Sequence, residues 1–497
     1  MRFALLDSKF VPQPLLNSSM TTSPISHHED LPRQPINTSF SFNADMQAML
    51  AGKQLLLDEL PFPLHLIQDH YEAGYLIYRK GITMTKNSAK CMRCGNSDTR
   101  LFAKFPCARC GEECLYCRKC IMMGRITACT PLVSWTGPDP NFESVQSALL
   151  WTGALSEGQS AASTKVIEAV NRNEELLVWA VCGAGKTEVL FAGINEALIE
   201  GKRVCVATPR TDVVLELTPR FKKVFPSIEI ASLFGGSEDR HLQSQLTIST
   251  THQLLRFYNA FDTMILDEVD AFPYSVDETL QHAVTQSRKP ASSMIYLTAT
   301  PNETWQAQCL AGKRAFVTIP ARYHRHPLPV PEFSWCGNWK KLMNKGRLPE
   351  NVLLWLKNRL DSNKQALLFF PSIDSMEKIL PILRKLNANI QAVHAEDPQR
   401  KEKVQAMRDG RVPILLTTTI LERGVTFPNV DVAVLGAEER IFTESALVQI
   451  AGRVGRSAEF PDGNITFFHY GKTEEMVKAR KQIIKMNKEA VEKGLIR

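Results

Sequence analysis

The chain has 497 residues and a mass of 55.8 kDa, a length typical of about three domains. Because 44% of its residues are apolar and 22% are charged, it can bury a sizeable core, which excludes a fibre, a disulfide-stabilised miniprotein and a wholly disordered chain. The net charge of +7 favours polyanionic partners only mildly. No apolar run is long enough to cross a membrane, and Asp7 and Lys9 interrupt the N-terminal one, so we expect a cytoplasmic protein.

Composition divides the N-terminal part of the chain into three segments. We expect residues 1–45, which are rich in Ser, Thr, Pro, Asn and Gln from residue 12 onward, to be a flexible tail. Residues 46–89 regain apolar groups and are predicted to be a partly helical N-terminal region. Residues 90–130 contain eight of the twelve cysteines and are predicted to be a four-cysteine zinc-binding module. The module is basic, with eight Lys/Arg against three Asp/Glu over residues 90–125.

From about residue 150, short runs of Val, Ile, Leu and Phe alternate with longer helical patterns. Continuous apolar strands separated by helices are typical of parallel sheets covered on both faces, so we predict an α/β fold. An irregular stretch at 322–345 divides the series into domains at 150–325 and 340–475. A basic helix is expected at 476–497. Its Lys/Arg-rich face suits nucleic acid or the anionic inner face of the cell membrane, although a solvated face is the commoner case.

A phosphate-binding loop is predicted where the apolar run at 175–181 leads into AVCGAGKT and a helical pattern. Ala180 takes the place of the first glycine of the loop, and Gly183 and Gly185 let the backbone approach phosphates closely. Lys186 would reach the β- and γ-phosphates, and the Thr187 hydroxyl would bind Mg²⁺.

A carboxylate site is predicted about eighty residues later, where the apolar strand 262–266 ends in DEVD. The carboxyl edge of a parallel sheet is where ligands bind, so the two motifs should meet there. Asp267 would hold Mg²⁺ through water, and Glu268 would polarise the water that attacks the γ-phosphate.

Two arginines follow in the stretch ALVQIAGRVGR (446–456), which has a helical pattern. Arg453 and Arg456 are three residues apart, so on a helix they would project from nearly the same face. Two guanidinium groups aimed together suit the charge of a transferring phosphoryl group.

These motifs, in this order over roughly residues 150–470, resemble those of superfamily 2 helicases. A Q motif with Gln159 precedes the set, and position 269 is Val rather than the Ala of DEAD-box RNA helicases. The closer resemblance is to the ComFA family of bacterial DNA-uptake ATPases, on TTHQLL (250–255), LDEVDAFPY (266–274), TTTILERGVTFPNVDV (417–432), GRVGRS (452–457) and a cysteine module ahead of the motor.

The resemblance implies two RecA-like motor domains with ATP at their interface and Gln159 at the adenine. Arg453 and Arg456 would act as arginine fingers, Gln449 would contact the γ-phosphate or its water, and Thr298 and Thr300 would couple the ATP state to domain closure. A single-stranded DNA track would run along six residues of the two domains: Pro209, Arg210, Thr250, His252, Thr418 and Thr419.

The implied function is an ATP-driven single-stranded DNA translocase that imports transforming DNA. The implied partners are single-stranded DNA, a membrane DNA channel and other competence proteins. Three alternatives stay open: a replication-restart helicase of the PriA type, an RNA helicase, and a zinc-dependent adaptor with an ATP switch. None of the motifs specifies an oligomeric state or a direction of movement.

Paired C-x2-C knuckles in the cysteine module are typical of Zn²⁺ sites, and disulfides are the weaker alternative in a cytoplasmic protein. Two groupings of the thiols are possible. A sequential one joins Cys91, Cys94, Cys107 and Cys110. A nested one joins Cys91, Cys94, Cys117 and Cys120, and YCRKCIMMGR (116–125) favours it because it resembles the second knuckle of the ComFA family. The nested grouping leaves Cys107, Cys110, Cys114 and Cys129 for a second ion.

Overall fold

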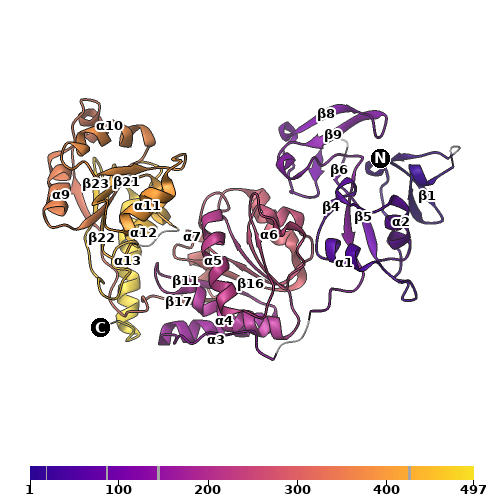
Figure 1. The fold of residues 1–497 in the computed structure, drawn as a ribbon, viewed down its shortest axis with the longest axis horizontal. Coiled ribbons are helices and arrows are strands. Elements are labelled where there is room, and N and C mark those ends of the chain that lie inside the picture. The colour runs from indigo at the N-terminus through magenta and orange to yellow at the C-terminus, as the bar shows by residue number, and fades with distance from the viewer. Residues whose placement is uncertain (18–19, 86–87, 143–145, 424–426, 497) are drawn as a thin grey trace. The chain divides into compact units, whose positions relative to one another are not determined.

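The computed structural model describes residues 1–17, 20–85, 88–142, 146–423 and 427–496 (Figure 1). Parts of four expectations therefore lie outside the described residues: 18–19 of the tail, 86–87 of the region at 46–89, 424–426 of the motif at 417–432, and 497 of the basic helix. The chain divides into two compact units, Met1–Thr152 with Ile167–Glu175 and Ala192–Tyr296, and Gly153–Val166 with Leu176–Phe191 and Leu297–Arg497. Within the described chain, no helix is both long and apolar enough to span a bilayer.

The start of the chain is folded, which corrects the expected flexible tail. Strands β1 (Arg2–Leu6), β2 (Lys9–Pro12) and β3 (Ser23–Pro24) form an antiparallel sheet in the order β2-β1-β3. Asp7 and Ser8 connect β1 to β2 with φ of 45° and 61°, the two left-handed residues that a tight hairpin requires. Phe3 and Phe10 are fully buried. The composition typical of a tail begins only at residue 12, whereas the hairpin lies before it in a segment rich in apolar residues.

A second small sheet completes the core of this region. Its strands β4 (Leu55–Leu56), β10 (Pro131–Trp135) and β5 (Leu76–Lys80) are antiparallel in the order β4-β10-β5. Helices α1 (Ala44–Leu50) and α2 (Leu64–Glu72) pack into the same apolar cluster as Phe3 and Phe10. The cysteines lie on and beside two hairpins, formed by β6 (Ile82–Met84), β7 (Ala89–Cys91), β8 (Phe102–Cys107) and β9 (Glu112–Cys117).

A seven-stranded sheet carries the first half of the motor motifs, in the order β13-β14-β12-β15-β16-β11-β17. The neighbouring strands β13 and β14, β14 and β12, β12 and β15, β15 and β16, and β11 and β17 run parallel to each other. The strands are β11 (Glu175–Ala180), β12 (Val204–Thr208), β13 (Ile230–Leu233), β14 (Leu246–Thr250), β15 (Phe261–Leu266), β16 (Arg288–Thr298) and β17 (Phe316–Ile319). The helices are α3 (Glu157–Arg172), α4 (Lys186–Ile199), α5 (Thr211–Val224), α6 (Glu278–Ser287) and α7 (Glu303–Leu310).

A six-stranded parallel sheet, in the order β18-β23-β22-β19-β21-β20, carries the second half. The strands are β18 (Glu332–Trp335), β19 (Gln365–Phe369), β20 (Gln391–Val393), β21 (Ile414–Thr417), β22 (Val430–Leu435) and β23 (Ile465–His469). The helices are α8 (Trp339–Met343), α9 (Glu350–Asp361), α10 (Ile373–Arg384), α11 (Arg400–Arg408), α12 (Glu444–Ala451) and α13 (Glu474–Glu492).

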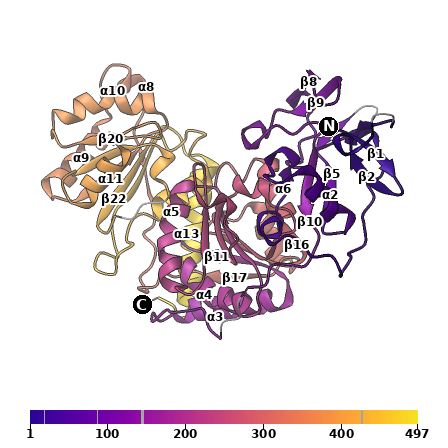
Figure 2. The ribbon, with the colours of Figure 1, turned by 45° about the vertical axis from the view of Figure 1, so that its right-hand side comes forward.

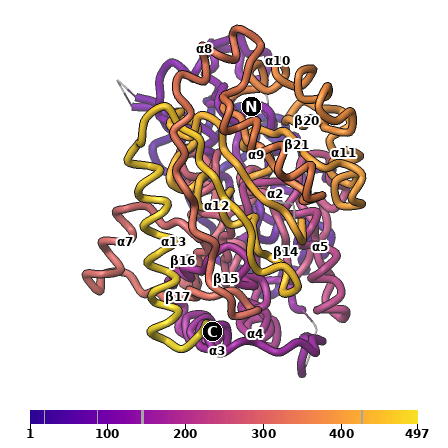
Figure 3. Tube along the Cα trace, turned by 90° about the vertical axis from the view of Figure 1, so that its left-hand side faces the viewer, coloured from indigo at the N-terminus to yellow at the C-terminus, as the bar shows by residue number. Residues whose placement is uncertain are grey.

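Both faces of this sheet are buried, which explains its continuous apolar strands. Leu367 and Phe369 of β19 belong to the cluster that contains residues of α11, α12 and α13, whereas Ala366 and Leu368 belong to the cluster of α8, α9 and α10. Figure 2 shows α8, α9, α10 and α11 around this sheet. Helix α13, expected to be a separate basic helix, is part of this core and runs beside α12 (Figure 3). The two parallel sheets confirm the predicted α/β class.

Candidate active site and metal centres

The phosphate-binding loop has the geometry that its sequence predicts. It connects β11 to α4, so Lys186 and Thr187 occupy the first turn of the helix. Gly183 and Gly185 have φ of 82° and 69°, a conformation that L-residues rarely adopt. A Cβ on Gly185 would lie 2.3 Å from Nε2 of Gln159, so the loop has no room for a side chain there. Because glycine has no side chain, a phosphate group can approach the backbone of this loop closely at the N-terminus of α4.

Gln159 and Gln449 both contact the phosphate-binding loop. Nε2 of Gln159 donates to the Ala184 carbonyl at 2.8 Å, and its Oε1 accepts from the Ser156 nitrogen at 2.8 Å. The Cys182 thiol lies 3.0 Å from Oε1 of Gln449. Both glutamines thus hold the loop, whereas the adenine contact of Gln159 and the γ-phosphate contact of Gln449 stay predictions.

The acidic motif follows β15, a strand of the same parallel sheet as β11. The Asp267 nitrogen donates to the Ala207 carbonyl at 2.8 Å, and Oδ1 of Asp267 accepts from the Glu268 nitrogen at 2.8 Å. Glu268 has φ of 54°. Left-handed backbone at a residue other than glycine is uncommon and is enriched at functional sites, so the turn fixes the direction of this carboxylate at some energetic cost.

The predicted helix through both arginines is wrong. Helix α12 ends at Ala451, Gly452 is its C-cap, and Gly455 has φ of 68°. The two glycines end the helix, so Arg453 and Arg456 lie in the turn that follows it. Nε of Arg453 donates to the Glu422 carbonyl at 3.0 Å, and Nε of Arg456 donates to the Gly452 carbonyl at 2.8 Å.

The two threonines predicted to couple ATP binding to domain closure lie at the end of β16 and just after it. Thr298 is fully buried, and its hydroxyl accepts from the Thr300 nitrogen at 2.9 Å. The Thr300 hydroxyl donates to Ser445 Oγ of α12 at 2.9 Å. The coupling of the ATP state to domain closure by Thr298 and Thr300 stays a prediction.

Arg322 is a site residue that the sequence analysis missed, because it lies in the stretch that was interpreted only as irregular. Its side chain is 1% exposed and donates to four backbone carbonyls, at Cys182 (3.1 Å), Val454 (2.6 Å), Gly452 (3.3 Å) and Gly455. Burial, together with the charge of Arg456, lowers the pKa of Arg322 to about 10. It therefore stays charged at neutral pH and joins the phosphate-binding loop to the arginine turn.

The six residues of the predicted DNA track share a position just at or after the end of a parallel strand. Pro209 and Arg210 follow β12, Thr250 and His252 lie at and after the end of β14, and Thr418 and Thr419 follow β21. The Arg210 guanidinium forms an ion pair with Asp212 at 3.1 Å. Each set is thus presented at the ligand-binding edge of its own sheet, and its contact with nucleic acid stays a prediction.

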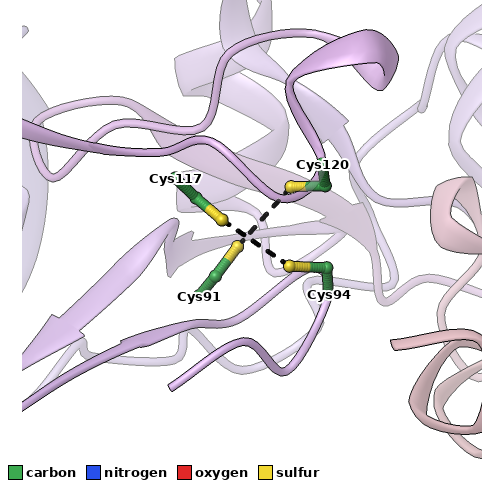
Figure 4. A group of neighbouring side chains, drawn as sticks. All are labelled: Cys91, Cys94, Cys117 and Cys120. Carbon is green, nitrogen blue, oxygen red and sulfur yellow. Dashed lines mark hydrogen bonds between the residues drawn. The ribbon is translucent and has the colours of Figure 1, made fainter. Parts of the chain in front are cut away.

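The cysteines form two groups of four, and the first is the nested set (Figure 4). Within each group, all four sulfurs lie within 4.8 Å of one another and are buried. In the first group, Cys91 Sγ lies 3.8 Å from Cys120 Sγ, and Cys94 Sγ lies 3.7 Å from Cys117 Sγ. Four sulfurs at about 2.3 Å from a central zinc are separated by about 3.8 Å, so this group fits a tetrahedral ion. The sequential set is not brought together.

Side chains around the first group support that fit. Nη2 of Arg93 lies 3.2 Å from Cys120 Sγ and donates to the Cys120 carbonyl at 2.7 Å. Nδ2 of Asn96 lies 3.8 Å from Cys117 Sγ. Donors to thiolate sulfur orient the ligands and offset the negative charge of a four-thiolate site.

Family models match three successive parts of the chain. Residues 37–134 match the competence protein ComFA N-terminal domain. Residues 152–303 match the type III restriction enzyme res subunit, and residues 348–458 match the helicase conserved C-terminal domain. The competence protein ComFA of Bacillus subtilis (strain 168) is 50% identical over 454 residues, which cover 91% of this chain and 97% of the relative. The chain belongs to the ComFA family.

Other relatives agree with this assignment. ComFA of Streptococcus pneumoniae is 40% identical over 399 residues, covering 78% of this chain and 91% of the relative. A single-residue variant of S. cerevisiae Dbp5 bound to RNA and ADP BeF3 has a TM-score of 0.50 and 14% identity, and the match covers 66% of this chain and 87% of that one. That similarity concerns the fold alone. The matches to the res subunit and to the helicase C-terminal domain, with the two parallel sheets, show that this ComFA family member has the two RecA-like domains of a superfamily 2 helicase.

Proposed function

We propose that this ComFA family member is an ATP-driven translocase that moves single-stranded DNA during uptake of transforming DNA. The observation that carries the proposal is the set of helicase motifs at the carboxyl ends of the strands of two RecA-like sheets. The predicted DNA track lies at the same strand ends. Family membership supports the role in competence, and a membrane DNA channel and other competence proteins are the partners that this role would require.

In this proposal, ATP supplies the phosphoanhydride bond whose hydrolysis drives movement, and this chain's residues bind it and orient the attacking water. The backbone between Gly183 and Lys186 would hold the phosphates. Thr187 and Asp267 would hold Mg²⁺, and Glu268 would orient the water. Arg453 and Arg456 would offset the charge that develops on the phosphoryl group.

The proposal assigns a structural Zn²⁺ to Cys91, Cys94, Cys117 and Cys120. The ion would fix the knuckle that contacts α6, the helix after the acidic motif. Gln286 Nε2 of α6 donates to the Met92 carbonyl at 2.9 Å, and a Cβ on Gly95 would lie 2.7 Å from Cγ of His282. Lys119 also lies 3.5 Å from Asp277, the N-cap of α6. The knuckle would therefore support the motor segment that carries Glu268.

The test is the steady-state ATPase rate of the purified protein with single-stranded DNA, duplex DNA or single-stranded RNA, at two salt concentrations. We expect strong stimulation by single-stranded DNA that weakens at high salt, because phosphate contacts release counterions. Lys186→Ala should abolish turnover, whereas Lys313→Ala, at an exposed loop lysine, should retain it.

Three outcomes would replace the proposal. Stimulation by RNA alone would indicate RNA remodelling. Stimulation by forked duplex DNA with strand separation would favour a replication-restart helicase. ATP turnover without stimulation by any nucleic acid, and without displacement of a roadblock from DNA, would favour an adaptor with an ATP switch.

A further inference from the structure

The second group of cysteines has the geometry of a metal site. Cys107, Cys110, Cys114 and Cys129 are each at most 6% exposed. Cys107 Sγ lies 3.7 Å from Cys129 Sγ, which matches the edge of about 3.8 Å expected for four sulfurs around zinc. A disulfide needs about 2.0 Å, and all four thiols are free. We propose that these four thiols bind a second Zn²⁺ that is independent of the first.

The two groups are separated by strand β9. Cys114 and Cys117 both lie on β9 and are three residues apart. Side chains alternate between the faces of a strand, so an odd spacing directs these two thiols to opposite faces. Each face of β9 thus contributes one ligand to a different group. A single ion shared between the groups is excluded by this arrangement.

Each group also has its own polar surroundings. The first has Arg93 and Asn96 near its sulfurs. In the second, the Thr127 hydroxyl lies 3.6 Å from Cys129 Sγ, and Arg2 Nη1 donates to the Cys110 carbonyl at 2.8 Å. Separate outer partners are what two independently tuned metal centres require.

The second ion would hold together parts of the chain that are far apart in sequence. Cys107 ends β8, Cys114 lies on β9, and Cys129 precedes β10. The N-terminal hairpin rests on the same group, because the Met1 nitrogen donates to the Cys129 carbonyl at 3.3 Å and Arg2 also binds Glu112 at 2.8 Å. We infer a structural ion that fastens the β1–β2 hairpin to the β8–β9 hairpin.

Zinc content of the full-length protein tests the proposal. We expect two ions per wild-type chain by mass spectrometry of the metal, one in Cys107→Ser and one in Cys94→Ser. The control Cys309→Ser, at a buried cysteine of α7, should retain two. A wild-type count of one that Cys107→Ser leaves unchanged would overturn the proposal.

A second measurement needs no variant and so does not depend on the folding of Cys107→Ser. Titration of the native protein with a mercurial should release two zinc ions as eight thiols react. Release of one ion with four thiols, with the other cysteines reacting without further release, would overturn the second site. The zinc count is separate from the DNA-stimulated ATPase, so failure of the translocase proposal would leave this result unaffected.

Discussion

The motor and the N-terminal region of this protein differ in what holds their functional groups in place. The motor presents its groups from sheets of seven and six parallel strands, and the smaller sheet has an apolar cluster on each face. The cysteines instead lie on two-stranded hairpins, which are marginally stable alone. Burial therefore stabilises the motor, whereas the cysteine hairpins would depend on the two proposed zinc ions. Chemistry and stability should thus respond to different changes in the two regions.

The largest expected effect separates chemistry from stability in the motor. Glu268→Gln keeps the shape of the side chain and removes the base, so kcat for ATP should fall by about 100-fold or more. Nucleotide affinity and zinc content should stay at their wild-type values, as a nucleotide-binding titration and a zinc assay would measure. Glu200→Gln, at an exposed site, is the control. A normal kcat in Glu268→Gln would remove Glu268 from the catalytic set.

Loss of the first zinc should change stability rather than chemistry, which is the reverse of the effect of Glu268→Gln. Cys94→Ser leaves three thiols for an ion that otherwise contributes several kcal/mol of folding free energy. Amide hydrogen exchange should rise over residues 90–130 and over α6, because Gln286 and His282 contact the knuckle. Residues 340–475 should keep their protection. An equal rise in exchange over residues 90–130 and residues 340–475 would contradict the idea that the two regions are stabilised differently.

Arg322 tests how firmly the motor segments are joined. Arg322→Met removes one donor from each of four carbonyls, of which Gly452 keeps its bond from Arg456 and Gly455 its contact with His324 Nε2. The carbonyls of Cys182 and Val454 lose the donor that Arg322 supplies, so the change should cost about 3 kcal/mol of stability. Arg322→Lys keeps the charge but cannot reach all four carbonyls, so its cost should be smaller. The arginine turn should also lose its position, which lowers kcat more than it raises KM for ATP. An ATPase assay and thermal denaturation of both variants test this prediction. Equal stability and equal kcat in Arg322→Met and Arg322→Lys would contradict it.

The parts of the site that sequence could predict are those built from neighbouring residues. A phosphate-binding loop and an acidic turn after a strand are local, so spacing places Lys186 and Glu268 correctly on the elements. The nested cysteine grouping was favoured because a local string, YCRKCIMMGR, resembles the second knuckle of the ComFA family. Helical spacing failed at Arg453, because the helix predicted through 446–456 ends at its C-cap, Gly452.

Long-range contacts explain the remaining failures. Arg322 acquires its role only from carbonyls that are more than a hundred residues away, and nothing in its own surroundings in sequence signals this. The hairpin at Asp7 and Ser8 depends on burial of Phe3 and Phe10 against α2 and β5, which are formed by later residues. Composition alone therefore led to the prediction of a flexible tail where the chain forms a folded hairpin.

The smallest effect concerns a lysine buried where the N-terminal region meets the first motor sheet. Lys53 is 5% exposed, and burial, together with the charges of Arg203 and Arg256, lowers its pKa to about 8. Below pH 8 both the folded and the unfolded chain carry this proton, so the folded state bears the full cost of the buried charge. Between pH 8 and about 10.4, the unfolded chain binds more protons at Lys53 than the folded chain does, so the free energy of unfolding rises with pH.

Lys53→Met removes the cost of the buried charge and also the hydrogen bond from Nζ to the Arg240 carbonyl. The variant should therefore be more stable than the wild type by about 1–2 kcal/mol at pH 7. The advantage should shrink as the pH approaches 10, as thermal midpoints of both proteins would show, with Lys104→Met as the exposed control. A constant difference from pH 7 to pH 10 would show that Lys53 keeps an ordinary pKa, and that the contact between the two regions tolerates a buried charge.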